Sequence, residues 1–491
     1  MLFNSYIFVF LFLPLCLAGY YLLNHFRLTK PALGFLLGMS LWFYGFFNPS
    51  YLVIILASVF VNFLFYTLSK HVEKPGLRKG LKVLAVAVNL AVLFYFKYFD
   101  FFLSNLNAIF HADFVLRNIL LPLGISFFTF QQISFVIDAF NGQVPDYDFL
   151  SYACFVTFFP QLVAGPIVTH DELVPQLMDE SRKRFNFESF APGLYIFAIG
   201  LAKKVLLADT LGTVVDHCFA AVGDYRFEQI NSAGAWVAAL AFTLQLYFDF
   251  SGYSDMAIGI GRMFNVELPQ NFNSPYKAIS IVDFWKRWHL TLTRFFTKYV
   301  YIPLGGNRKG KGRTYVNIML VFFLSGLWHG ANYTFIIWGL LHGIGNCLTR
   351  LAAKLWNRLP RFIAWLFTFL YVILAYVFFR ANSVKDALYV ISKMLHFSAG
   401  PIHPELLESF AQPELAVLSD ALSALGAAQP QLILLLVFLA ITLILAVFPK
   451  NSSQRLEGFS LSVKEGLFTA VLLVWCIFSF AGVSTFLYFN F

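Results

Sequence analysis

The chain has 491 residues, of which 59% are hydrophobic and 12% charged, and its mean hydropathy is +0.70. Soluble domains carry about 25% charged residues, so this composition excludes an ordinary soluble globular protein. The net charge of +9 could suggest a nucleic-acid partner. However, the basic residues cluster in short loops between apolar runs, which is the positive-inside pattern of membrane proteins. We therefore expect an all-α, polytopic integral membrane protein without a nucleic-acid partner.

The five cysteines are scattered without a CxxC pair, and most lie in apolar segments. We interpret them as reduced packing residues, because a free cysteine often behaves as a small buried hydrophobe.

The first hundred residues contain apolar runs of about 17–25 residues, each long enough to cross a hydrocarbon core. The first run lacks the basic n-region of a signal peptide and exceeds its apolar core, so we expect it to remain as the first transmembrane helix. A loop rich in lysine and arginine follows the third run, and placing it in the cytoplasm puts the N-terminus outside. The predicted helices are approximately 5–24, 32–48, 51–69 and 83–98.

The segment 118–181 contains no lysine or arginine. Its two apolar runs, 119–140 and 151–168, carry several prolines and glycines. Broken segments at membrane depth persist only where protein or a water-filled cavity shelters them. Two interpretations stay open here: a re-entrant element that lines a cavity, or two kinked helices.

Basic residues at 182–184 return the chain to the cytoplasm, and further apolar runs follow. A polar segment without lysine or arginine, 394–429, is predicted to form an extracytoplasmic loop. We expect about eleven crossings plus re-entrant or surface-lying pieces, in a single domain over 1–491. The later helices are predicted at approximately 191–208, 233–261, 315–328, 332–349, 362–379, 430–448 and 466–489.

The segment 283–330 holds two histidines in apolar, aromatic-rich sequence. Before it, Ser280 and Asp283 have the spacing of a capping box, which predicts a helix from about residue 281. The 3.6-residue period gives this helix an aromatic face and a basic face. Because it is short and charged, it should lie at the cytoplasmic interface or dip partway into the membrane rather than span it. His289 falls between the two faces, either as a functional residue or as an interfacial histidine that holds a carbonyl. The two faces are Phe284, Trp288, Leu292, Phe295, Tyr299 and Arg287, Thr291, Arg294, Lys298.

The loop 302–313, IPLGGNRKGKGR, combines glycines with cations. Such a loop could bind the phosphates of a cytoplasmic donor such as a coenzyme A thioester, although it is not a Walker A motif. It is equally a positive-inside topology signal, and the two roles are compatible. The predicted donor-binding residues are Arg287, Arg294, Lys298, Arg308, Lys309 and Lys311.

His329 lies in the sequence SGLWHGANYTFIIWG. A helix from Tyr315 would have only about 14 residues before this histidine, or about 21 Å, which is short of a full hydrocarbon core. Glycines on both sides weaken the helix, so we expect His329 inside the membrane, at a helix break and within reach of a cavity. An intramembrane histidine in that position favours a functional role over simple core packing.

Around that cavity we predict as lining residues Trp285, Trp328, Asn332, Gln161, Tyr247 and Asp249. We predict no metal site, because Asp249 and Asp255 are six residues apart and do not share a helix face. The sequence also lacks HExxH, GxSxG and dinucleotide-binding motifs.

Taken together, FWKRWHLTLTRFFTKYVYIPLGGNRKG and SGLWHGANYTFIIWG resemble the membrane-bound O-acyltransferase (MBOAT) superfamily, and within it the bacterial alginate O-acetylation group. FVTFFPQLVAGPIVTHDELVPQL (155–177) and LQLYFDFSGYSDMAIGIGRMFNVELPQNFNSPY (244–276) also resemble that group, and the similarity covers at least 1–390. One departure is Thr297-Lys298-Tyr299-Val300, where the familiar pattern has an Arg-Asp pair and its neighbours.

The resemblance implies an MBOAT fold around a central funnel, with His329 as the catalytic general base and His289 as a second functional histidine. It implies no bound cofactor, and acetyl-CoA or another acyl thioester as the donor substrate. Expected partners are an extracytoplasmic acetyltransferase with a serine acceptor, the polysaccharide itself, and membrane lipid, in the inner membrane of a bacterium. The alternatives are D-alanyl transfer to teichoic acids, a lipid or protein acyltransferase and, on composition alone, a passive transporter.

Overall fold

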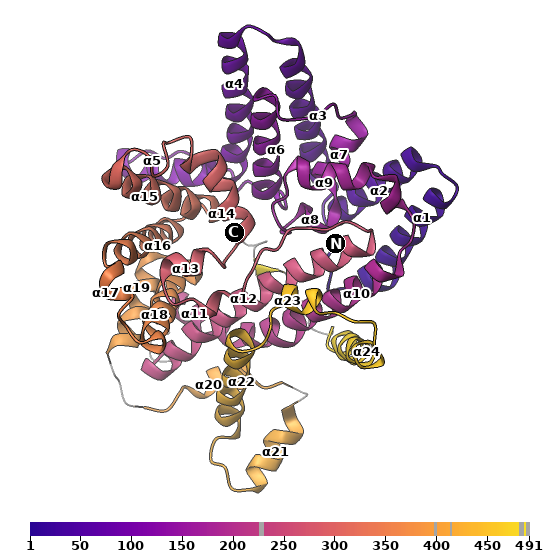
Figure 1. Cartoon of the computed structure of the whole chain (residues 1–491). Helices are drawn as coiled ribbons and strands as arrows, with labels where there is room; N and C mark the ends of the chain where they lie inside the picture. Colours follow the sequence, from indigo (N-terminus) through magenta and orange to yellow (C-terminus); the bar gives the residue numbers. More distant parts are fainter. Residues whose placement is uncertain (225–229, 397–399, 413–414, 481–485, 488–491) are drawn as a thin grey trace.

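The computed structural model describes residues 1–224, 230–396, 400–412, 415–480 and 486–487, and the secondary structure of these residues is helical (Figure 1). Within these described ranges, seven helical segments are long and apolar enough to cross a bilayer, which confirms a multi-pass, all-α membrane protein. The expected total of about eleven crossings stays a prediction, as does the single domain. The seven segments are Phe8–His25, Ser50–His71, Pro75–Phe110, Phe187–Gly223, Ser232–Met263, Arg361–Arg380 and Pro430–Val447.

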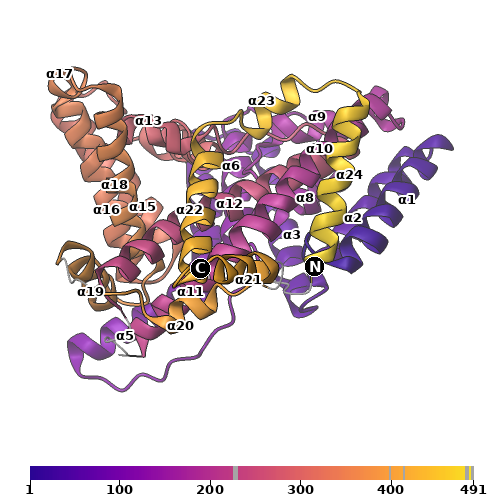
Figure 2. The same ribbon diagram turned by 90° about the horizontal axis from the view of Figure 1, so that it is seen from below.

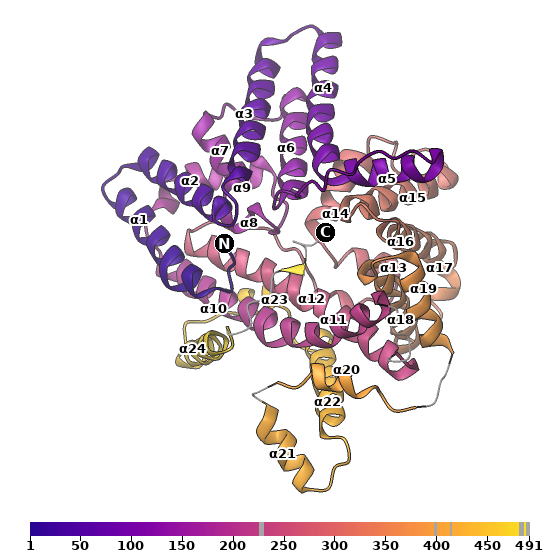
Figure 3. The same cartoon turned by 180° about the vertical axis from the view of Figure 1, so that it is seen from behind.

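The N-terminal third follows the predicted helices closely, with one extension. The fourth helix begins at Pro75 rather than near residue 83 and does not end near residue 98: helical structure continues through a π-helical segment to Phe110, because no proline or glycine stops it. Figure 3 shows α3, α4 and α6 standing together at one end of the molecule. The elements are η1 (Phe8–Phe12), α1 (Leu13–His25), α2 (Thr29–Gly45), α3 (Ser50–His71), α4 (Pro75–Leu93), the π-helix η2 (Phe94–Tyr98) and α5 (Phe99–Phe110).

The segment predicted to be broken is indeed interrupted twice. The helix α6 (Ile125–Phe140) begins only after Gly124, whose φ of +69° suits glycine. The second run forms α7 (Phe149–Thr157) and the four-residue α8 (Phe159–Leu162), with a break at Phe158 and a non-helical stretch after residue 162. This is a broken element rather than two continuous kinked helices.

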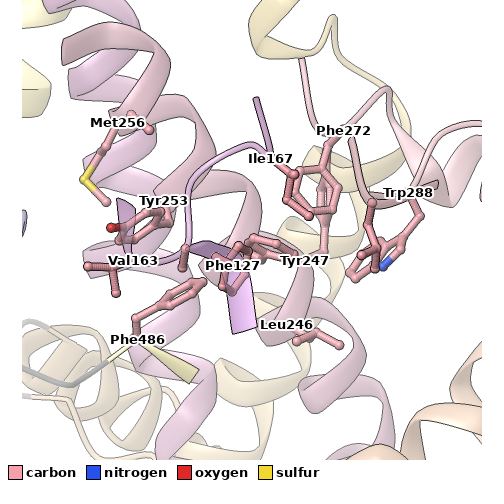
Figure 4. Packing of buried hydrophobic residues seen from close by; sticks show 14 of the residues in the cluster. Phe127, Val163, Ile167, Leu246, Tyr247, Tyr253, Met256, Phe272, Trp288 and Phe486 are labelled. Carbon is pink, nitrogen blue, oxygen red and sulfur yellow. The ribbon is translucent and has the colours of Figure 1, made fainter. Parts of the chain in front are cut away.

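The centre of the molecule is α12 (Ser232–Met263), which packs against α10 (Phe187–Ala202). Glycines let the two backbones approach closely, since a Cβ on Gly200 would lie 2.6 Å from the carbonyl oxygen of Gly252. The helix predicted for 191–208 does not end near residue 208. After α10 the π-helix η4 (Lys203–Ala208) leads directly into α11 (Asp209–Gly223). Figure 4 shows aromatic and aliphatic side chains, among them Tyr253, filling the core around α12.

The predicted interfacial helix begins where expected but is not continuous. Ser280 caps α13 (Ile281–Trp285) by accepting a hydrogen bond from the amide of Asp283 at 3.0 Å. The helix then stops, because His289 has a φ of +45° and starts the separate helix α14 (Leu290–Phe296). The π-helix η7 (Thr297–Tyr301) follows. The prediction of a single amphipathic helix that continues through residue 299 is therefore wrong.

The hairpin that carries His329 consists of α15 (Gly310–His329) and α16 (Tyr333–Leu351). The helix α15 ends at His329 as predicted, but it begins inside the basic loop rather than at Tyr315. With 20 residues it is about 30 Å long, but its first turn is polar and basic, and it is not among the seven candidate spans of the described residues.

The remaining helices surround this hairpin and the core. An amphipathic helix, α19, was not predicted, and the last helix ends at Phe478 instead of continuing to 489; residues 481–485 and 488–489 lie outside the described residues. These elements are α9 (His170–Met178), η3 (Glu180–Lys183), η6 (Pro275–Lys277), α17 (Ala353–Trp356), α18 (Arg361–Arg380), α19 (Val384–Leu395), α20 (Pro404–Ser409), α21 (Ala416–Ala424), α22 (Pro430–Val447), α23 (Ser452–Glu457) and α24 (Val463–Phe478).

The molecule has two distinct faces across its thickness. Figure 2 shows α13, α17 and α23 along one edge and α5, α19 and α20 along the opposite edge. The loop 302–309, which holds Arg308 and Lys309, belongs to the first edge: α15 and α16 form a hairpin, and the end of α16 leads into α17 at that edge, so the start of α15 lies there too. We call these two sides the basic face and the opposite face.

Candidate active site

His329 lies at the C-terminal end of α15 and is only 3% exposed. Its imidazole is surrounded by aromatic rings, with centroid distances of 4.9 Å to Trp328, 4.9 Å to Trp338 and 5.1 Å to Phe379. These aromatic rings form an apolar cage, which we call the histidine cage. It fixes the imidazole ring and excludes most water from it.

His289 is fully buried and lies near the same cage. Its Nδ1 lies 3.0 Å from Oδ1 of Asn271, which also accepts a hydrogen bond from the hydroxyl of Thr291 at 3.0 Å. Because that oxygen accepts, we assign the proton of His289 to Nδ1. Its Nε2 has no hydrogen-bond partner in the described part of the chain. The indole of Trp328 stands between the two histidines, 6.1 Å from the His289 ring centroid.

A third histidine, His342 on α16, was missed by the sequence analysis. It is fully buried, its ring lies 4.9 Å from that of Trp338, and its Nδ1 accepts a hydrogen bond from the indole of Trp285 at 3.2 Å. The signal was present in the sequence GLLHGIG, which places a histidine between glycines on an apolar helix, as at His329.

A hollow of about 420 Å³ opens beside His329. The broken segment supplies much of its wall through residues 121–127 and Val163, which favours the cavity-lining interpretation of that segment. The side chain of Lys97 lines it from η2. Its ammonium donates hydrogen bonds to the carbonyl oxygens of Trp328 at 2.6 Å and His329 at 3.1 Å.

A second hollow, of about 1040 Å³, adjoins the chain immediately after His329. It is lined by Gly330, Ala331 and Asn332, and also by Asp100 and Lys97. It lies toward the opposite face, because these residues connect the ends of α15 and α16 that point away from the basic loop. The end of α15 therefore separates this outer hollow from the one beside the imidazole.

A third hollow, of about 840 Å³, lies between α13–α14 and α15–α16. Lys286 and Arg350 contribute basic side chains to a wall that is otherwise mainly apolar, and Ser325 lies one turn before His329 on α15. The indole of Trp285 lines it and lies 5.9 Å from Trp338, which in turn contacts His329. This hollow thus leads from the basic face toward the histidine cage.

A fourth hollow, about 1580 Å³, is an apolar groove between α4–α5, α6, α14 and α15. Leucine, isoleucine and phenylalanine side chains dominate its wall, and Trp328 also lines it. An acyl chain of membrane lipid would fit its chemistry.

The six cations predicted to bind a donor fall into two groups. Arg287, Arg294 and Lys298 form ion pairs with Asp283 (2.8 Å), Glu172 (2.7 Å) and Asp138 (2.9 Å), respectively. Arg308, Lys309 and Lys311 are exposed at the basic face, in the loop before α15 and in its first turn.

The six residues predicted to line the cavity also divide. Trp285, Trp328 and Asn332 each line one of the hollows beside the histidine cage. The other three are buried in the core: Gln161 donates to the carbonyl of Phe155 at 2.8 Å, Tyr247 packs 5.1 Å from the ring of Tyr276, and Asp249 pairs with Lys204 at 2.7 Å. Among the residues that the structure describes, no cluster of three histidine, cysteine or acidic side chains could hold a metal ion.

The arrangement suits an acid–base reaction between two substrates that arrive from different sides. A buried imidazole can remove a proton from a hydroxyl, and hollows approach it from the basic face and from the opposite face.

Comparisons with known proteins agree on one family. A model described as "MBOAT, membrane-bound O-acyltransferase family" matches residues 140–385. A peptidoglycan O-acetyltransferase of Helicobacter pylori is 40% identical over 100% of this chain and 98% of its own length. A "Probable alginate O-acetylase" of Pseudomonas putida is 41% identical over 81% of both chains. A teichoic acid D-alanyltransferase of Bacillus subtilis is more distant, at 28% identity over 49% of this chain and 62% of the other.

Proposed function

Because the chain belongs to the membrane-bound O-acyltransferase family, and is an O-acyltransferase, we propose that it transfers an acetyl group from a cytoplasmic thioester to a hydroxyl for polysaccharide O-acetylation. The observation that carries the proposal is the position of His329, buried at the end of α15 and approached by hollows from both faces.

The donor, acetyl-CoA, enters the hollow at the basic face. Lys286 and Arg350 at its wall and the cations of the loop 302–309 attract the phosphates, while the apolar wall accepts the pantetheine arm. Coenzyme A here is part of the substrate and not a resident cofactor.

His329 acts as the general base. It removes the proton from the acceptor hydroxyl, the oxygen forms a bond to the acetyl carbonyl carbon, and the carbon–sulfur bond breaks. The proton is then returned to the departing thiolate, so the products are an acetyl ester and free coenzyme A. His289 assists His329 or positions the donor, with Trp328 between the two rings.

The acceptor approaches through the outer hollow at the opposite face. It is a serine of an extracytoplasmic acetyltransferase that relays the group to an alginate-like exopolysaccharide, or the polysaccharide itself. Peptidoglycan is a second candidate, because the peptidoglycan O-acetyltransferase of Helicobacter pylori covers 100% of this chain while the alginate O-acetylase covers 81%. D-alanyl transfer has weaker support, since the corresponding relative covers 49%.

The orientation of the chain belongs to the same proposal. The positive-inside rule places the basic face in the cytoplasm, so the N-terminus and the outer hollow face outward across the inner membrane of a bacterium.

The test is turnover of radiolabelled acetyl-CoA by purified protein in nanodiscs, with and without a serine-bearing partner or polysaccharide. We expect release of free coenzyme A by the wild type and a loss of at least about 10²-fold in His329→Ala, the range typical of a general base. His342→Gln is the matched control, because His342 is equally buried but lies farther along the cage, beside Trp285. Full activity in His329→Ala would contradict the assignment of the base.

A further inference from the structure

Lys97 is a basic residue within the candidate span Pro75–Phe110, and ionisable side chains inside such spans are rare and costly. It belongs to the π-helix η2, a wider helical turn between α4 and α5. Single π-turns inside α-helices occur frequently at functional sites. No role was assigned to this residue from the sequence.

The side chain of Lys97 closes the end of the helix that carries His329. Its ammonium donates to the carbonyl oxygens of Trp328 at 2.6 Å and His329 at 3.1 Å, and to the hydroxyl of Ser126 at 3.1 Å. The last carbonyls of a helix have no partner within the helix, and its C-terminal end carries a partial negative charge. A lysine ammonium satisfies both requirements at once.

The neighbouring Tyr98 completes the same cap. Its hydroxyl donates to the carbonyl oxygen of Leu327 at 2.8 Å. The π-helix η2 thus presents two successive side chains to three successive carbonyls of α15. Since a neutral hydroxyl suffices for Leu327, the positive charge at the next position calls for a separate reason.

The charge of Lys97 has no carboxylate partner among the described residues. Asp100 lies three residues on, but its carboxylate accepts the amides of Arg117 at 2.8 Å and Ile119 at 3.1 Å. Instead, the Lys97 nitrogen donates hydrogen bonds to backbone carbonyls and lies 5.9 Å from the ring centroid of Trp328. An ionisable side chain inside a candidate span that has no acidic partner among the described residues points to a working site.

Lys97 also lines both the hollow beside His329 and the outer hollow. Its position therefore fixes the end of α15 between the two hollows, which is where the acceptor hydroxyl must come within reach of the imidazole.

We propose that Lys97 is a positioning residue that holds the end of α15, and with it His329, in the geometry needed for acyl transfer. The inference rests on the proposed function, because it assigns to His329 the role of general base. A displacement of about 1 Å of a reacting group costs about 10²-fold in rate, so the loss of this cap should act on kcat.

The variants to compare are Lys97→Met, Lys97→Ala and Lys97→Arg, with Tyr98→Phe as the neutral control on the same cap. We expect Lys97→Met to lower kcat by about 10²-fold while the KM for acetyl-CoA stays within about threefold, because the donor hollow is at the other face. Lys97→Arg should recover most of the rate, and added ethylammonium should partly restore Lys97→Ala through the outer hollow. Tyr98→Phe should lower kcat by less than about tenfold, since it removes the hydrogen bond to only one of the three capped carbonyls.

A second measurement does not depend on activity: modification of single histidines by diethyl pyrocarbonate, followed by peptide mass spectrometry. In Lys97→Met we expect faster modification of His329 with that of His342 unchanged, because only the end of α15 is released. The inference is overturned if Lys97→Met keeps kcat within about threefold, if ethylammonium has no effect, or if His342 is modified equally fast, which would indicate general unfolding. If the wild type itself releases no coenzyme A, the proposed function fails, and the modification pattern alone decides the role of Lys97.

Discussion

Gly326 of α15 and Gly339 of α16 face each other where the two helices cross, one turn before His329. A Cβ on Gly326 would lie 3.2 Å from the Cα of Gly339 and would collide with the carbonyl oxygen of Phe335. The backbone cannot yield easily at such a contact. The short distance between α15 and α16 therefore depends on glycine, which has no side chain, at both positions.

We therefore expect Gly326→Ala to separate the two helices and displace the imidazole. Overpacking of this kind costs about 1–3 kcal/mol of stability, and the displacement should lower turnover of acetyl-CoA by at least about tenfold. Gly312→Ala on the same helix is the matched control, because no atom lies within 4 Å of its added Cβ. That change should be neutral or stabilise the helix by up to about 1 kcal/mol. Equal activity of the two variants would show that the crossing tolerates a wider spacing.

Two carboxylates share one buried lysine at the contact of η4 with α12. Lys204 lies 2.6 Å from Asp209 and 2.7 Å from Asp249, and both Lys204 and Asp249 are at least 96% buried at their side chains. Removing one partner of a buried pair costs about 3–5 kcal/mol, because the other charge stays buried. We expect Lys204→Met to lower thermal stability in detergent more than Asp249→Asn, since the latter leaves the contact with Asp209.

The control for this comparison is Lys70→Ala. Lys70 pairs with Asp146, whose side chain is 90% exposed, and exposed pairs contribute about 1 kcal/mol or less. If Asp249→Asn instead abolished turnover without a loss of stability, the carboxylate would belong to the reaction path, beyond the cavity-lining position predicted from the sequence.

The stability of the protein should depend on pH through His170, at the start of α9. Burial lowers the pKa of this histidine below its usual value, and the nearby Lys298 acts in the same direction, while Asp171 and Asp138 oppose it. As the pH falls below about 6.5, the unfolded chain binds a proton that the folded chain does not, so the free energy of unfolding decreases.

We expect melting temperatures measured between about pH 7.5 and pH 5 to fall less steeply in His170→Gln than in the wild type. The glutamine keeps a polar group opposite the hydroxyl of Tyr147, which lies 3.3 Å from Nδ1 of the histidine. If the melting temperatures of the two proteins fell equally with decreasing pH, groups other than His170 would account for the loss of stability at low pH.

Most helices were predictable because hydropathy alone marks a segment that must cross a bilayer. The failures occurred where tertiary contacts override the periodic pattern. Residues 281–299 have an uninterrupted amphipathic period, yet the chain breaks at His289, where Asn271 holds the imidazole and also accepts the amide of Leu290 through its carbonyl at 2.9 Å. Asn271 is 18 residues away from His289, so the local pattern does not contain this information.

The same reasoning explains which residues of the candidate site were predictable from the sequence. His329 was predictable from a histidine between tryptophan and glycine in apolar sequence, whereas its capping residue, Lys97, lies 232 positions earlier in the chain. The aromatic sequence around Lys97 reads as an ordinary membrane helix, and only the fold brings it to the end of α15. Asp249 illustrates the reverse case, since it was predicted to line the cavity and the structure pairs it with Lys204 in the core.

The two groups of cations predicted to bind the donor should differ in function. Arg294 pairs with Glu172 and also donates to the carbonyl of Ile167 at 3.0 Å, so much of its charge is compensated locally. Arg308, Lys309 and Lys311 are exposed at the basic face. An exposed cluster attracts an anionic ligand over about a Debye length, and salt screens that attraction.

We expect the triple variant Arg308→Gln/Lys309→Gln/Lys311→Gln to raise the KM for acetyl-CoA several-fold, with kcat unchanged, because the cluster lies outside the histidine cage. The effect should shrink as the salt concentration is raised from about 50 to about 500 mM, where the Debye length falls below about 5 Å. Arg294→Gln should instead lower the melting temperature and leave the KM within about twofold, because its ion pair ties α14 to α9. A larger effect on KM from Arg294→Gln than from the triple variant would mean that the donor displaces Glu172 on binding, and that the loop serves only to orient the chain in the membrane.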